Sequence, residues 1–197
     1  MTSFSHKAYA YIAETTGIAA EVTPFFAAYE TLVLDMDTSV SQDARIFGVA
    51  LLYLGLGKLY NTGRELSQKG FAILQRSERV QTLHDIGYNA VFTAVVSPVL
   101  YFASGERDVE KILFGTLGGA VLGTINGAPV GYAIDVAKDL MGVKPCERGS
   151  YPSLVRNASP FQKRMLATWL LLGSLGLTEA IYAYHDSSFS LEHLLSE

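Results

Sequence analysis

Charge is scarce in this sequence and is absent from several long stretches. Only 17% of the 197 residues are charged, against about 25% in soluble domains. Residues 86–103 and residues 112–134 contain no charged side chain at all. The second stretch would form about 35 Å of helix, enough to cross a hydrocarbon core of about 30 Å. The pattern favours an integral membrane protein, although the apolar content of 49% leaves a soluble all-helical bundle as the alternative.

Motifs that carry enzyme or cofactor chemistry are also missing. Cys146 is the only cysteine, which excludes an intramolecular disulfide. There is no phosphate-binding glycine loop, HExxH motif or paired-cysteine site, and the four histidines lack metal-ligand spacing. A net charge of −4 gives no sign of nucleic-acid binding. We therefore expect no enzyme, no cofactor, no bound metal and no nucleic-acid partner.

The apolar stretches predict an all-α, polytopic membrane helix bundle. A four-span transporter-like core of two helical hairpins would occupy residues 1–141, with spans at about 9–33, 44–62, 85–104 and 111–135. A cytoplasmic loop at 142–162, a fifth span at 163–185 and a polar tail at 186–197 would follow. The first span is the weakest prediction because it contains three glutamates: Glu14, Glu21 and Glu30.

Basic residues are concentrated in two of the connections. Residues 63–83 and 135–164 together hold ten of the fifteen lysines and arginines. The positive-inside rule places both segments on the cytoplasmic side of the inner or plasma membrane. Five spans then put the N-terminus inside and the C-terminus outside. The mixture of basic and apolar residues at 66–83 further predicts a helix lying at the cytoplasmic interface.

Glycine recurs every four residues through the fourth expected span, at Gly115, Gly119, Gly123, Gly127 and Gly131. In a bilayer such a series forms a smooth groove against which another helix can pack closely. We expect the groove to mediate helix packing, most simply in a parallel homodimer. Three prolines lie inside expected spans and predict kinks there: Pro24, Pro98 and Pro129.

Ionisable side chains within the expected spans are the candidate functional residues, because burying a charge in lipid is costly. The candidates for the substrate and proton pathway are Glu14, Glu30, Arg45, Arg64, Asp85 and Asp135. Glu30 would pair with Arg45, and Arg64 with Asp85 or Asp135, as gates or substrate handles. Structural ion pairs or interface anchors are the alternative for each of them.

An ordered series of short motifs over residues 12–142 resembles the L-alanine exporter family of small bacterial inner-membrane proteins. Its members are Glu14-Thr15, Glu30, Arg45, Tyr60, Arg64-Glu65, Asp85-Ile86, Ser97-Pro98-Val99, Gly127-Ala128, Gly131-Tyr132 and Asp135. The family's usual aspartate is a glutamate at Glu14. The fifth span, the long loop before it and the opposite placement of the C-terminus also depart from the four-span family.

The resemblance implies proton-gradient-driven export of L-alanine or a similar small neutral amino acid. A zwitterionic substrate needs a carboxylate for its ammonium group and a cation for its carboxylate. Glu30, Asp85 or Asp135 would supply the first, and Arg45 or Arg64 the second. The alternative is a non-transporting assembly or regulatory subunit of the membrane that binds partner helices through the glycine groove.

Overall fold

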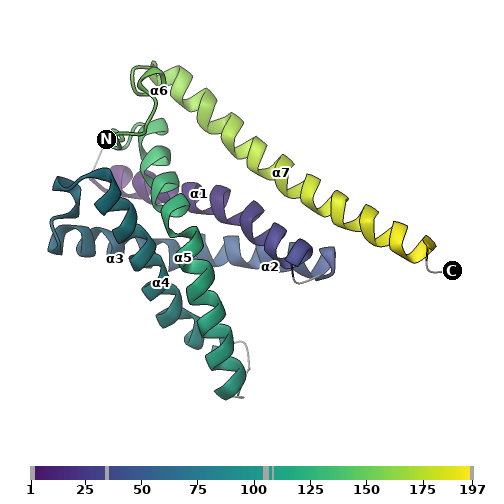
Figure 1. The fold of residues 1–197 in the computed structure, drawn as a ribbon. Coiled ribbons are helices and arrows are strands. Elements are labelled where there is room, and N and C mark those ends of the chain that lie inside the picture. The colour runs from purple at the N-terminus through teal and green to yellow at the C-terminus, as the bar shows by residue number, and fades with distance from the viewer. Residues whose placement is uncertain (1–2, 34–35, 104–106, 108, 196–197) are drawn as a thin grey trace. The chain divides into compact units, whose positions relative to one another are not determined.

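The computed structural model describes residues 3–33, 36–103, 107 and 109–195. Every regular element in this part of the chain is helical (Figure 1). The predicted all-α class is therefore confirmed. Residue 104, which ends the expected span 85–104, and residues 196–197 of the expected tail lie outside the described residues.

The first expected span lies within α1 (Ser3–Ala28) and a π-helical turn, η1 (Tyr29–Val33), that continues it. Pro24 lies inside α1. The second expected span, at 44–62, begins within α2 (Thr38–Leu51). It continues through the π turn η2 (Leu52–Leu56) into α3 (Gly57–Gly70).

The helical path through the second expected span is broken at Gly55. This residue has φ 139° and ψ −18°, a conformation that suits glycine because it has no Cβ. The Tyr11 hydroxyl of α1 donates to the carbonyls of Leu52 (2.8 Å) and Tyr53 (2.7 Å). Tyr11 thus satisfies backbone acceptors where the regular pattern of helix hydrogen bonds is interrupted. The sequence prediction had placed breaks only at prolines.

The predicted interfacial helix over 66–83 is wrong. α3 ends at Gly70, and Ala72 adopts a left-handed conformation with φ 50°. A short 3-10 turn, η3 (Ile73–Gln75), precedes α4 (Glu78–Ala103). Gly70 is a poor helix former at the end of α3, and the backbone carbonyl of Ser77 accepts the amide hydrogens of Val80 and Gln81 at the start of α4. The segment is therefore a turn between two helices.

The remaining helices are α5 (Val109–Leu140), the short α6 (Ser153–Arg156) and α7 (Pro160–Leu195). Pro98 lies inside α4 and Pro129 inside α5. α7 continues through the part of the expected polar tail that the structure describes. α6 lies within the expected loop at 142–162.

The chain forms two compact units, which we describe separately. One contains residues 1–58 and 134–197, and the other contains residues 59–133. In the first unit α7 packs along α1, as Figure 1 shows, and the Ser174 hydroxyl donates to the Ala20 carbonyl at 2.6 Å. The expected fifth span therefore belongs to the same compact unit as the first helix of the chain.

In the second unit α5 runs beside α4 (Figure 1), and the glycine series of α5 faces α4. A Cβ added at Gly127 would lie 2.5 Å from the Ile86 Cα, and one at Gly123 would lie 3.1 Å from the Asn89 carbonyl. The Asn89 side chain donates to the Gly123 carbonyl at 2.8 Å. Such backbone proximity requires glycine. The surroundings of Gly115 lie outside the described side chains.

Two helical segments are long and apolar enough to cross a membrane, Ile112–Leu140 of α5 and Pro160–Ser187 of α7. Only 18% and 11% of the residues in their apolar windows are buried, unlike the core helix of a soluble protein. Large side chains such as Leu117, Ile125 and Trp169 are more than 60% exposed. These surfaces support membrane association. The other three expected spans do not meet the same criterion among the described residues, so the five-span bundle remains a prediction.

Candidate functional site: buried ion pairs

Arg64 of α3 and Asp85 of α4 form a buried, two-point ion pair in the second unit. The Arg64 Nε donates to Asp85 Oδ1 at 2.8 Å, and its Nη2 donates to Oδ2 at 2.9 Å. The two side chains are only 2% and 0% exposed. Nη2 also lies 3.3 Å from the Gly131 carbonyl of α5. The pair therefore connects three helices without contact with bulk water.

Glycines make room for this pair. A Cβ at Gly131 would overlap the carboxylate of Asp85, so only glycine lets the acid lie against α5. On α3, a Cβ at Gly63 would meet the Tyr88 hydroxyl, which donates to the Tyr60 carbonyl at 2.8 Å. The rings of Tyr60 and Tyr88 pack edge to face with centroids 5.2 Å apart. Tyr88 of α4 is thus held against α3 beside Gly63, the residue that precedes Arg64.

His84 is a member of this cluster that the sequence prediction missed. Its Nδ1 lies 3.4 Å from Asp85 Oδ1 and its Nε2 lies 2.8 Å from the Ser67 hydroxyl. The ring is stacked with Tyr88, and its side chain is only 8% exposed. The available signal was that histidine directly precedes Asp85 in the sequence, whereas metal-ligand spacing of the histidines gives no sign of this role.

Glu30 and Arg45 form a second pair, in the first unit, as the sequence predicted. The Ser41 hydroxyl donates to Glu30 Oε2 at 2.7 Å and lies 3.1 Å from the Tyr182 hydroxyl of α7. The Arg45 guanidinium also lies over the Phe26 ring, 5.0 Å from its centroid. This pair is more exposed than Arg64–Asp85, with side chains 11% and 20% exposed.

Glu14 and Asp135 have partners that the sequence did not predict. Glu14 of α1 pairs with Lys138 of α5. Asp135 accepts hydrogen bonds from Arg148 in the following loop, with the Arg148 Nε 2.8 Å from Asp135 Oδ2. Each of the six predicted pathway residues therefore takes part in an ion pair with another residue of this chain.

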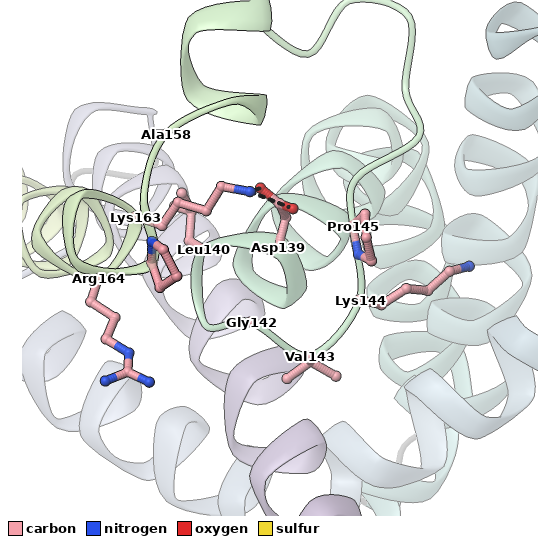
Figure 2. A pocket seen from close by; sticks show the side chains of 10 residues that line it. Asp139, Leu140, Gly142, Val143, Lys144, Pro145, Ala158, Lys163 and Arg164 are labelled. Carbon is pink, nitrogen blue, oxygen red and sulfur yellow. Dashed lines mark hydrogen bonds and ion pairs between the residues drawn. The ribbon is translucent and has the colours of Figure 1, made fainter.

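A cavity of about 220 Å³ lies where α5 meets the loop before α7 (Figure 2). Figure 2 shows Lys163 reaching the Asp139 carboxylate, while Lys144 and Arg164 extend away from that pair. The Lys163 Nζ lies 2.8 Å from Asp139 Oδ2, and the Tyr151 hydroxyl donates to the same oxygen at 2.7 Å. The acid of this cavity is thus already neutralised and hydrogen-bonded.

Among the described residues, no group of three or more His, Cys, Asp or Glu is arranged to hold a metal ion. No family model, curated protein or solved structure matches the chain. The chemical capacity of the site comes from its acids. A buried carboxylate can bind a proton or pair with the arginine beside it. Together the carboxylate and the arginine can also bind the ammonium and the carboxylate of a zwitterion.

Proposed function

We propose that the chain is a proton-coupled membrane exporter of a small neutral amino acid such as L-alanine. The observation that carries the proposal is the buried, two-point Arg64–Asp85 pair. Two fully buried charges are costly to retain for stability alone, because apolar replacements of similar volume are often equally stable. The presence of such a pair is accounted for if it opens for a substrate during transport.

A small amino acid carries the same two charges as the pair that it would replace. Its carboxylate can bind the Arg64 guanidinium at two points, and its ammonium can bind the Asp85 carboxylate. A proton that binds Asp85 removes the partner of the ammonium. Substrate and proton thus compete for one carboxylate, which couples proton entry to substrate exit.

The test is flux in proteoliposomes that contain the purified full-length chain. An imposed pH gradient should drive L-alanine movement, and dissipating the gradient with a protonophore should abolish it. The double variant Arg64→Met/Asp85→Leu should carry no flux. A wild-type chain with no gradient-dependent flux for any small neutral amino acid would overturn the proposal.

The alternative is a non-transporting assembly or regulatory subunit. The observation in its favour is that each predicted pathway residue already has a charged partner within the chain, as structural pairs would. The sequence predicted that the partner helix of this alternative binds the glycine groove, which α4 of the same chain occupies. The partner helix would instead bind the exposed apolar side of α5, which includes Leu117, Val121 and Ile125. The double variant Arg64→Met/Asp85→Leu would then still assemble with its partner, which co-purification from membranes can measure.

A further inference from the structure

We propose that His84 and Ser67 carry the proton of Asp85 to and from the cytoplasmic side. This inference rests on the proposed function and extends it by naming the proton path. It starts from a geometrical fact: the imidazole has one nitrogen facing the buried acid and the other facing a hydroxyl on a different helix.

Burial differs along this line of groups. Asp85 is fully buried, the His84 side chain is 8% exposed, and Ser67 is half-buried. A carboxylic acid that is cut off from water exchanges its proton only through groups that touch it. Histidine suits this role because each of its ring nitrogens can gain or lose a proton.

The transfer balances in both directions. Protonated Asp85 gives its proton to the His84 Nδ1, while the Nε2–H of His84 passes to the Ser67 oxygen and the Ser67 hydroxyl proton passes to water. The ring ends neutral with its proton on Nδ1, and Asp85 ends as a carboxylate facing Arg64. The ring must return to the Nε2–H tautomer before the next proton leaves in the same direction. The reverse sequence protonates Asp85.

The groups around His84 fit a relay. On α4 it faces Asp85 and is stacked with Tyr88, and on α3 it meets Ser67 beside the Arg64 that pairs with Asp85. η3 packs against α4 and contributes no ionisable side chain within Ile73–Gln75. From α5, Gly131 faces Asp85 without a side chain. The basic residues at 63–83 predict that this end of α3 and α4 lies at the cytoplasmic surface.

Two transport modes separate proton delivery from substrate binding. Net flux driven by a pH gradient requires Asp85 to gain and lose a proton in each cycle. Exchange of labelled for unlabelled L-alanine at equal pH does not, because the carrier can return with substrate bound. A residue that only transfers the proton affects the first mode and spares the second.

The experiment measures both modes in proteoliposomes for His84→Gln and Ser67→Ala. We expect His84→Gln to lower gradient-driven flux by about a hundredfold while exchange stays within about twofold of wild type. Ser67→Ala should lower gradient-driven flux in the same selective way and Ser67→Thr should restore it. Ser67→Ala also serves as the second test if His84 variants fold poorly.

His185→Gln is a matched control, because His185 also lies beside a hydroxyl, that of Thr38 (3.3 Å), and an adjacent acid, Asp186 (3.7 Å), but belongs to the first unit. It should leave both modes unchanged. Wild-type gradient-driven flux in His84→Gln, or equal loss of both modes, would overturn the relay while leaving the exporter proposal standing. Absence of all flux in the wild type would overturn both.

Discussion

At the residue scale, the buried Arg64–Asp85 pair ties the stability of the chain to the matching of two charges. Each is buried with a full charge, and each is matched at two points by the other. Removing one partner leaves an uncompensated charge in an apolar environment, whereas removing both leaves none. Stability and transport should therefore respond differently to single and double substitutions.

The single variant Asp85→Leu should lower the free energy of unfolding by about 3–5 kcal/mol, because Arg64 stays buried without its carboxylate. The double variant Arg64→Met/Asp85→Leu should recover most of that loss. Unfolding in mixed micelles with increasing denaturing detergent measures both. A double variant as unstable as the single one would contradict the assignment of the loss to an unpaired charge.

Cys146 offers a second residue-scale prediction, and it lies outside the expected spans. Burial raises the pKa of its thiol and the Asp135 and Asp139 carboxylates add to the rise, while a backbone hydrogen bond with Arg148 and the charge of Arg148 oppose it. Since the thiolate is the reactive form, alkylation by iodoacetamide at pH 8 should be at least about tenfold slower in the folded chain than after unfolding.

The raised pKa also sets a pH dependence of stability. The folded state holds the Cys146 thiol proton more tightly than the unfolded state. The thiol therefore contributes its full stabilisation at a pH below its pKa in the unfolded chain. This stabilisation is lost as the pH rises through the thiol pKa of the folded chain. Because Cys146 is the only cysteine, the labelling signal reports this site alone. Equal rates in folded and unfolded chains would contradict the burial of the thiol.

At the element scale, the α4–α5 contact depends on the absence of side chains. Gly127 lies directly against the backbone of α4, whereas a Cβ at Gly118 would meet nothing within 4 Å. Gly127→Ala should therefore cost about 1–3 kcal/mol through overpacking. Gly118→Ala, in the same helix, should be neutral or slightly stabilising because alanine is the better helix former.

The same unfolding assay in mixed micelles measures this pair of variants. Similar effects of the two substitutions would indicate that α4 and α5 are not in the close contact described. A homodimer built on the same groove would have to displace α4 from Gly119, Gly123, Gly127 and Gly131. Cross-linking of wild type and Gly127→Ala in membranes would therefore reveal whether self-association uses the groove or another face.

Sequence reasoning was most successful where one physical constraint dominated. Charge-free stretches predicted helices, and the opposite charges at Glu30 and Arg45 predicted a pair that the structure contains. The partner of Asp135 could not be predicted in the same way, because Arg148 reaches it only through the fold of the loop after α5. Gly55 was equally unpredictable, since the sequence does not distinguish its left-handed backbone from the helical glycines nearby.

At the scale of the whole molecule, the exposed apolar surfaces of α5 and α7 predict that the chain stays in the membrane. Alkaline carbonate should not extract it, and detergent should be required for solubility. A monodisperse chain recovered from the aqueous fraction without detergent would contradict membrane insertion.

The orientation of the chain is a separate prediction from its basic residues. A fluorescent reporter fused to the N-terminus should be active in the cytoplasm, and a phosphatase that works only outside should be active when fused to the C-terminus. An inactive phosphatase at the C-terminus would contradict the five-span count. The reporters would then favour an even number of spans.

The discontinuous first unit has a consequence for biogenesis. α1 is translated before α7, although the two helices pack against each other in the folded unit. Residues 59–133 form one continuous segment and can complete their contacts earlier. Until α7 is made, the side of α1 that α7 covers stays exposed, and a chain cut short before Pro160 would leave that side open to quality-control proteases.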